Sequence, residues 1–493
     1  MSAIPNEYDV VAYPALSFPD THPDRLAVMA ALHGVTAAPP AQARVIEIGC
    51  SEGANLIPMA YAMPEAEFTG LDLAGLPIAR GRQRIGELGL GNIQLFQADL
   101  CSVSGLGEYD YILAHGVYAW VPDPVRDALL ALCGERLAPN GVAFISYNAL
   151  PGAYLRNFVR DALRCGSRQK QAPEDQVAAG MRLLQLIVQS RPEGDAYRRL
   201  LEDHLGRMNK RLPGGTYHDE MNPAYEPVSV AQLAAHARQH GLAYLCEAEL
   251  PTPLDPGMRP DLIEAVAEFA GDDTVQQEYV LDFLRVRGFR QTLLVRSGVP
   301  VQAKFTTAAM PRMRFSSLAT ATASSRPDAR TYQLERGAEV NIDQPPVVAL
   351  LDRLIAAAPR ALDYAEVSET LTGRGLLPEQ VPGLLLQMAI ARLIELHLWE
   401  APVAASLSER PRASACSRQE AQTRAHVANL WHKTVDLNDP TVRALFSLLD
   451  GTRTRADLLA AIQAQFPAMD AAALQDRIEP NLETFLRAAL LEA

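Results

Sequence analysis

The sequence predicts an α/β fold with a mostly parallel β-sheet, followed by mainly helical units. Between residues 44 and 148, short apolar runs alternate with helical stretches, and each run ends at a polar residue or a glycine. Two later runs, 241–250 and 289–296, are also strand-like and complete a set of seven strands. The first five predicted strands are 44–49, 67–73, 92–99, 109–115 and 141–148.

The order of these patterns predicts a first domain over residues 1–300. Its N-terminal segment, 1–30, is expected to fold over the site as a lid. After residue 148 the periodicity becomes helical, which predicts a helical insertion or regulatory region at about 165–227. Ligands of open α/β sheets bind beyond the carboxyl ends of the strands, so the strand ends are the candidate ligand positions.

Two similar units are expected after the first domain, at 301–400 and 401–493. Each is predicted to contain three helices and a final apolar run, an arrangement that resembles a winged helix. The polar segment 316–330, rich in Ser, Thr, Ala and Arg, is expected to be a linker or an exposed excursion. A chain of 493 residues is long enough for about three domains.

The composition favours a soluble protein and disfavours several classes. No apolar run approaches the roughly 18 residues of a membrane span, and the N-terminus lacks a secretion signal, so we expect a cytoplasmic protein. A net charge of -13 argues against nucleic acid as the partner. The six cysteines lie far apart without a C-x-x-C pair, so neither disulfides nor a metal site are expected.

The strongest local signal is the loop "EIGCSEGAN", which joins the first strand to a helix. Gly49 and Gly53 allow a sharp turn and a close backbone approach, and the following helix N-terminus favours a ligand carboxylate. The G-x-x-x-G spacing, with Glu47 before it, differs from the G-x-G-x-x-G of nicotinamide sites. We expect Glu47, Gly49, Cys50, Gly53 and Asn55 to bind a cofactor, although a plain strand-to-helix turn could use the same glycines.

Two acidic residues at successive strand ends strengthen this prediction. Asp72 can accept hydrogen bonds from both hydroxyl groups of a ribose, and the adjacent Leu73 is also expected to bind the cofactor. Asp99 can accept from an adenine amino group while the backbone NH of Leu100 reaches the ring. Either acid alone could instead be a helix cap or a surface charge.

Residues 44–148 resemble the class I methyltransferases, which implies a Rossmann-like seven-stranded core. The resemblance also implies S-adenosyl-L-methionine as cofactor and S-adenosyl-L-homocysteine as product. The N-terminal segment, "HGVYAWVP", "SYNALPG" and "LDGTRTRADLL" further resemble bacterial methyltransferases with a regulatory domain, the group that contains the rickettsial protein lysine methyltransferases. This second resemblance covers nearly the whole chain and implies lysine methylation of a protein substrate, with helical domains for substrate access and dimer formation. One departure is Ser51, where the family usually has glycine.

The expected acceptor side follows strands four and five. Methyl transfer from a sulfonium needs a neutral amine, and a lysine with an ordinary pKa near ~10.4 must be favoured in its uncharged form by burial. We expect Tyr118, Trp120, Tyr147 and Asn148 to line the acceptor pocket, with Tyr13 added from the lid.

Three further residues have more than one open interpretation. His115 could contact the cofactor, accept a proton or be a structural residue at a strand end. Thr21 and His22 could reach the cofactor from the lid, or the segment could be a strap in which Thr21 or Asp24 caps the following helix.

Three functions therefore remain open. The leading hypothesis is a protein lysine methyltransferase; the alternatives are a small-molecule methyltransferase and a noncatalytic cofactor-binding regulatory protein. DNA binding by the winged-helix-like units is disfavoured by acidic flanks, and "HGVY" is not the N-P-P-Y motif of amino-group methylation on bases. A homodimer is expected as a possible assembly.

Overall fold

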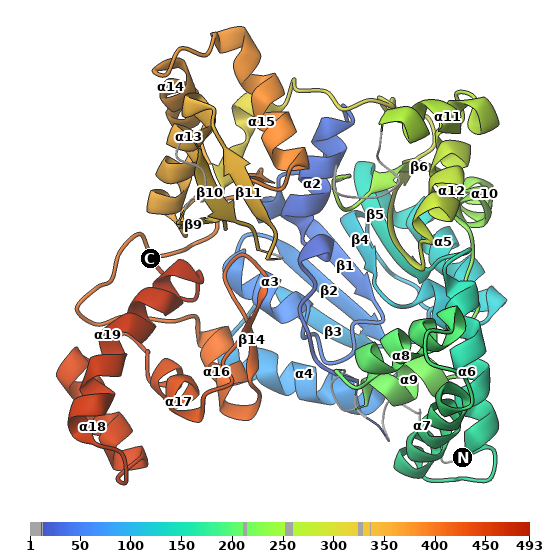
Figure 1. Ribbon diagram of the computed structural model, residues 1–493, viewed down its shortest axis with the longest axis horizontal. Coiled ribbons are helices and arrows are strands. Elements are labelled where there is room, and N and C mark those ends of the chain that lie inside the picture. Colours follow the sequence, from blue (N-terminus) through green and yellow to red (C-terminus); the bar gives the residue numbers. More distant parts are fainter. Residues whose placement is uncertain (1–10, 12, 211–213, 252–259, 324–328, 336) are drawn as a thin grey trace.

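The computed structural model describes residues 11, 13–210, 214–251, 260–323, 329–335 and 337–493 (Figure 1). A seven-stranded sheet lies at its centre in the order β3-β2-β1-β4-β5-β7-β6, with β7 antiparallel to both neighbours. The fold class and all seven predicted strands are confirmed. The strands are β1 Arg44–Ile48, β2 Glu67–Asp72, β3 Ile93–Gln97, β4 Tyr109–Ala114, β5 Leu137–Asn148, β6 Leu242–Glu247 and β7 Phe289–Arg296.

Helices cover both faces of this sheet. On one face, apolar side chains of α2, α3 and α4 share a core with Val45 and Phe144. On the other face, α5 and α10 pack against the adjacent residues Ile46 and Ile145, because successive strand residues point to opposite faces. These helices are α2 Pro23–Leu32, α3 Leu56–Ala62, α4 Gly75–Leu88, α5 Asp123–Arg136 and α10 Val230–Gln239, and α11 Pro260–Ala270 and α12 Thr274–Arg285 precede β7.

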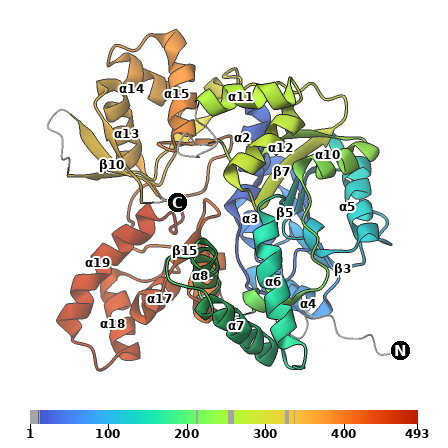
Figure 2. The ribbon, with the colours of Figure 1, turned by 45° about the vertical axis from the view of Figure 1, so that its right-hand side comes forward.

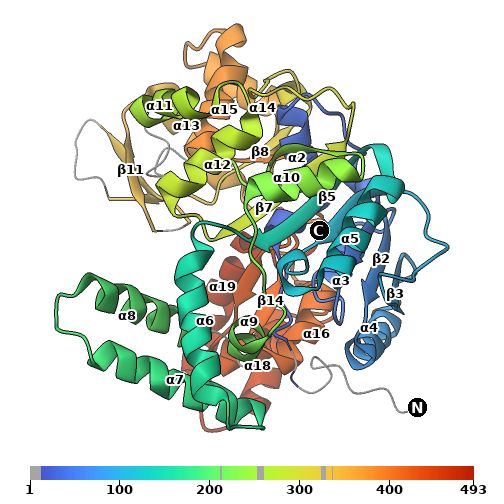
Figure 3. The same cartoon turned by 90° about the vertical axis from the view of Figure 1, so that its right-hand side faces the viewer.

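The helical insertion projects from the end of β5 and forms a small core of its own (Figure 3). It begins at Ala153, earlier than the expected residue 165, because the chain turns into a helix directly after β5. Gly152 fixes this turn, since its NH donates to the Arg287 carbonyl at 3.0 Å. The inserted helices are α6 Ala153–Ser167, α7 Pro173–Gln189, α8 Ala196–Met208 and α9 Gly215–Met221.

The described residues from 297 to 397 include two small antiparallel sheets and three α-helices. Segment 316–330, expected to be a linker or an exposed excursion, is not a plain linker, because β9 and part of β10 lie there and pair, with Thr322 opposite Thr331; residues 324–328 lie outside the described residues. Tyr332, fully buried, anchors this ribbon. The elements are β8 Arg314–Ser316, β9 Thr320–Thr322, β10 Arg330–Gln333, β11 Glu339–Ile342, α13 Pro345–Ala357, β12 Leu362–Asp363, α14 Tyr364–Thr372, α15 Val381–Ile390 and β13 Glu395–His397.

The C-terminal region has a separate core, centred on Phe446, Leu458 and Phe485. It lies next to the amino-terminal half of the sheet, on the same side as α13–α15 (Figures 1 and 2). The domain boundaries near 300 and 400 stay predictions. Its elements are α16 Ala415–Thr423, β14 His426–Ala428, β15 Thr434–Asp436, α17 Pro440–Ser447, α18 Arg455–Gln465 and α19 Ala471–Arg487.

The structure also describes the cysteines and the apolar character of the helices. Each of the six cysteines is a free thiol. Of the helices within the described residues, none is both long and apolar enough to cross a membrane.

A buried ion cluster holds the last two strands to α12. The Arg290 guanidinium is inaccessible to solvent and bonds both oxygens of Asp282 at 2.8 Å, Glu247 at 2.6 Å and Glu278 at 2.8 Å. Removing one partner of such a cluster leaves buried charge uncompensated, which is far more costly than losing a surface pair.

We therefore expect Arg290→Met to lower the free energy of unfolding by about 3–5 kcal/mol. Urea unfolding followed by circular dichroism would measure this loss. Arg198→Met is the matched control, because Arg198 is paired with Glu202 on the surface at 2.8 Å and such pairs contribute about 0.5 kcal/mol. Equal losses in the two variants would contradict the assignment of Arg290 as a structural centre.

Candidate active site

The glycine loop at the end of β1 has the geometry that the sequence predicts. Gly49 and Gly53 have φ of +76° and +73°, which favour glycine. The NH groups of Gly49 and Cys50 donate to the Leu71 carbonyl at 2.8 and 3.1 Å. A Cβ on Gly49 would lie 2.7 Å from Cγ2 of Val117, so this position has no room for a side chain.

Ser51 occupies a position where glycine would be less strained, because its φ is +51°. Its NH donates to Oδ2 of Asp72 at 2.8 Å, which holds the loop against the end of β2. The loop therefore accommodates serine in place of glycine because Ser51 adopts a left-handed backbone conformation.

Asp72 is half-buried and faces the loop. Its Oδ1 accepts from the NH of Ala74 at 2.8 Å, and Oδ2 accepts from Ser51. This carboxylate lies at the carboxyl end of β2, where a ligand of an open α/β sheet is expected, and a carboxylate is an acceptor that suits ribose hydroxyl groups. Leu73 is 58% exposed beside it and offers an apolar surface to a nucleoside.

The residues expected to bind adenine lie just beyond β3. Asp99 is exposed, and its Oδ1 accepts from the NH of Cys101 at 2.9 Å. Leu100 is half-buried against the apolar core of the α5 face. Both positions are compatible with an adenine at this edge of the sheet.

Glu47 is a buried carboxylic acid below the loop. Its Oε1 accepts from Nδ2 of Asn55 at 2.9 Å, whereas Oε2 is buried without a hydrogen-bond partner. Burial, together with the charge of Asp72, raises the pKa of Glu47 to about 8. An unpaired buried acid next to a glycine loop fits a cationic group, such as the amino group of S-adenosylmethionine.

Asn55 contacts protein atoms with its whole side chain. Its Nδ2 donates to Glu47 and to Oγ1 of Thr21, both at 2.9 Å. Its Oδ1 accepts from the NH of Phe18 at 2.9 Å and lies 2.8 Å from Nε2 of His432. Asn55 and the fully buried Thr21 thus connect the loop to the N-terminal segment, and the expectation that they contact the cofactor stays a prediction.

His22 is also buried in protein contacts. Its Nδ1 accepts from the NH of Asp24 at 3.2 Å, so His22 caps α2, a role that we expected of Thr21 or Asp24. The ring lies 5.0 Å from Trp399, and burial lowers the pKa of His22 to about 4. The expectation that His22 contacts the cofactor therefore has no support from its surroundings. Residues 1–10 and 12 of the expected lid lie outside the described residues.

His115 lies beyond β4 and is covered by the N-terminal segment. The ring of Phe18 stacks on it with centroids 3.9 Å apart, and Oγ of Ser146 lies 3.2 Å from its Nδ1. Burial lowers the pKa of His115 to about 4, so the imidazole is neutral at physiological pH. Phe289, which sequence reasoning missed, packs edge-on at 6.1 Å and is 44% exposed.

The two sides of β5 separate the expected acceptor residues. Asn148 has the strand parity of Ser146 and so faces the His115 side, with Phe289 directly opposite it on β7. Its Oδ1 is buried without a partner. Tyr147 faces the opposite side, where its hydroxyl lies 3.1 Å from Oγ1 of Thr292.

Tyr118 is likewise engaged in the core. It is 3% exposed, and its hydroxyl lies 2.9 Å from Nδ1 of His236. Both phenols pack under the α10 face, and the expectation that Tyr118 and Tyr147 line an acceptor pocket stays a prediction. A strand buried on both sides gives no sequence alternation from which this could be read.

Trp120 and Tyr13 contact the inserted helices. The Trp120 ring lies 4.7 Å from that of Tyr225, and the Arg160 guanidinium lies 3.9 Å above Tyr225 and 5.1 Å above Trp120. Tyr13 is 40% exposed, and its hydroxyl donates to Asp219 at 3.3 Å. These contacts place both residues at the junction with the insertion.

Three family models match the chain. Residues 45–141 match a methyltransferase domain, and residues 216–296 match a predicted methyltransferase regulatory domain. Residues 409–492 match the model described as "PKMT, C-terminal winged helix domain". The regulatory match overlaps only the end of the segment expected to be regulatory and includes β6 and β7.

Two proteins of Rickettsia prowazekii (strain Madrid E) are similar in sequence. The uncharacterized protein RP028 is 34% identical over 36% of this chain and 72% of its own length. The chain belongs to this family of methyltransferases with a regulatory domain. The uncharacterized protein RP789 is 32% identical over 60% of the chain, which spans about half (54%) of that relative's length.

A solved structure shares the fold of the whole chain. PKMT2 from Rickettsia typhi, in complex with AdoHcy, superposes with a TM-score of 0.86 over 97% of this chain and 99% of that one. The sequence identity is 20%. The fold shared with PKMT2 therefore extends from the sheet through the C-terminal helices.

We expect Asp72→Ala to weaken S-adenosylmethionine binding at least about 30-fold, because hydrogen bonds to a charged group contribute about 1.5–3 kcal/mol each. Isothermal titration calorimetry would measure it. Asp110→Ala is the control: this acid lies at the other end of the sheet, paired with Arg44 at 3.0 Å. Unchanged affinity in Asp72→Ala would refute the ribose assignment.

Glu47 should make cofactor affinity depend on pH. Its acid is neutral below a pKa of about 8, whereas the cationic amino group of the cofactor favours the carboxylate, so binding releases a proton. Affinity should therefore rise between pH 5.5 and 7.0, by up to about tenfold per pH unit. Calorimetry in buffers of different ionisation enthalpy measures the proton. Glu47→Gln should bind more weakly with a flat profile, and an equal slope in that variant would assign the proton elsewhere.

Proposed function

We propose that this chain transfers methyl groups from S-adenosylmethionine to lysine side chains of a protein substrate. The observation that carries the proposal is the line of groups along the carboxyl ends of β1, β4 and β5. The unpaired acid of Glu47 lies at one end, neutral His115 in the middle and the unpaired Oδ1 of Asn148 at the other. The likeness to PKMT2 supports the same function.

Each group has a distinct task in this proposal. Bound S-adenosylmethionine supplies a methyl group on a positively charged sulfur. Glu47 and Asp72 hold the cofactor, and Oδ1 of Asn148 accepts one hydrogen of the lysine amine and so orients its lone pair. The new N–C bond forms as the S–C bond breaks, and that electron pair stays on sulfur.

The surroundings of His115 favour an uncharged amine. Phe18 stacks on the imidazole and Phe289 covers its edge, so an entering ammonium group would lose water without gaining a counter-ion. The lysine therefore gives up its proton to solvent before the transfer. His115 excludes water and stays neutral.

Exposed apolar side chains near the site support a protein substrate. Gly152 at the start of α6 contacts the turn between α12 and β7. Tyr154 on α6 is 63% exposed, and Val286 and Phe289 at the turn are 55% and 44% exposed. A peptide can cover such side chains, whereas a small metabolite would leave them in water. A homodimer and a cytoplasmic location stay predictions.

Labelled cofactor and cell extract test the proposal. We expect label in protein bands, recovered as methyl-lysine after hydrolysis, and no label with Asp72→Ala. Label only in small molecules would favour a small-molecule methyltransferase. Cofactor binding without any transfer would favour a regulatory cofactor-binding protein.

We expect Asn148→Ala to lower kcat at least about tenfold, because the amine loses the acceptor that orients it, while the cofactor Kd changes little. Tyr147→Phe is the neighbouring control, since its hydroxyl lies on the opposite face of β5. Steady-state kinetics with calorimetry separates the two effects. A loss of cofactor affinity in Asn148→Ala would place this residue on the cofactor side instead.

A further inference from the structure

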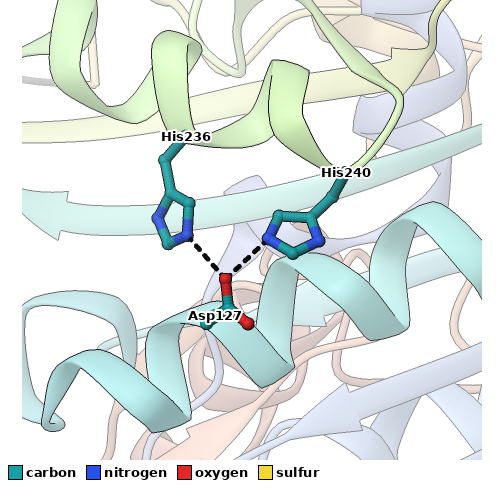
Figure 4. A group of neighbouring side chains, drawn as sticks. All are labelled: Asp127, His236 and His240. Carbon is teal, nitrogen blue, oxygen red and sulfur yellow. Dashed lines mark hydrogen bonds and ion pairs between the residues drawn. The ribbon is translucent and has the colours of Figure 1, made fainter.

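Three metal-ligating side chains converge between α5 and α10, outside the cofactor crevice. Oδ1 of Asp127 lies 3.3 Å from Nε2 of His236 and 2.9 Å from Nε2 of His240 (Figure 4). One ligand atom from each residue lies within 4.8 Å of the others. His236 and His240 are one helical turn apart, so their rings project from the same side of α10.

We propose that Asp127, His236 and His240 bind a divalent transition-metal ion, with Zn²⁺ as the first candidate. Two imidazole nitrogens and one carboxylate oxygen are ligands that Zn²⁺ and its neighbours accept, whereas Mg²⁺ and Ca²⁺ prefer oxygen alone. Tetrahedral ligands about 2.1 Å from zinc lie about 3.4 Å apart, so the three atoms need only small shifts. Water would complete the coordination.

A contact behind the ligands orients one of the imidazoles for a metal. The Tyr118 hydroxyl lies 2.9 Å from Nδ1 of His236, and Tyr118 is buried, so the imidazole orientation is fixed from behind. A hydroxyl both donates and accepts. Tyr118 can therefore accept from Nδ1–H when Nε2 binds the ion, and donate to Nδ1 when Nε2–H bonds Asp127.

The position of the site gives the ion a mechanical role. α5 and α10 pack side by side over the same face of the sheet, through Leu129, Leu130 and Leu233. An ion would clamp the two helices together. Because Tyr118 contacts His236, the ion would also be connected to the short helix Tyr118–Trp120. Trp120 in turn contacts Tyr225 at the junction with the inserted helices.

The expectation of no metal site rested on the spacing of the cysteines and on the lack of a histidine partner for them at metal spacing. The H-x-x-x-H pair at 236 and 240 is visible in the sequence, but Asp127 is 109 residues away from His236. Only the packing of α10 on α5 brings the third ligand to the pair. The inference does not depend on the proposed methyl transfer.

The test uses the full chain without a histidine tag, freed of metal by a chelator. We expect one equivalent of Zn²⁺ to bind with a Kd below about 10 µM and to raise Tm by a few degrees. Co²⁺ should give the visible absorption of a nitrogen- and oxygen-ligated site. His236→Ala/His240→Ala should weaken binding at least about 30-fold and abolish the Tm rise.

His426→Ala is the matched control, because His426 forms a similar pair with Asp436 at 2.7 Å in the C-terminal region. This variant should bind Zn²⁺ like the parent. The proposal is overturned if the parent binds no ion in this range. It is equally overturned if the double variant binds as tightly, which would place the ion at exposed Cys101 or Cys165.

Discussion

The candidate site depends on the hydrogen bonds of one buried group, the side-chain amide of Asn55. One buried group contacts the acid at the end of β1, the segment that leads into α2, and His432 of the C-terminal region. Hydrogen bonds in a buried network strengthen one another, and a partner lost from it leaves the others unsatisfied. The position of Glu47 is therefore set by contacts from three separate parts of the chain.

The buried acids around Arg290 and the buried acid Glu47 have different roles because their partners differ. Around Arg290, three carboxylates are paired with its guanidinium and with that of Arg287, so each acid has a cationic partner and the cluster serves the fold. Glu47 has one amide partner and an unused oxygen, so its proton is retained until a cation arrives. The same residue type is structural in one place and poised for a ligand in the other, and the neighbouring charge decides which.

The sheet could be predicted because its strands are long apolar runs that end in polar residues, and the glycine spacing located the loop. The opposite orientations of Tyr147 and Asn148 could not be predicted, because β5 is buried on both faces and its sequence shows no alternation of polar and apolar residues. The contact between Asn55 and His432 could not be predicted either, because the two residues are 377 positions apart in the sequence. The strands at 320–333 were missed because their polar, Thr-rich composition resembles that of a linker.

The distance along the chain between Asn55 and His432 has a consequence for synthesis. A ribosome adding about 5–20 residues per second needs roughly 20–75 s to travel from one to the other. During that interval β1 to β5 can already emerge and pair, yet the amide that orients Glu47 still lacks its histidine. The nascent protein thus acquires its sheet well before it acquires a finished cofactor pocket, because His432 lies so far after the sheet in the sequence.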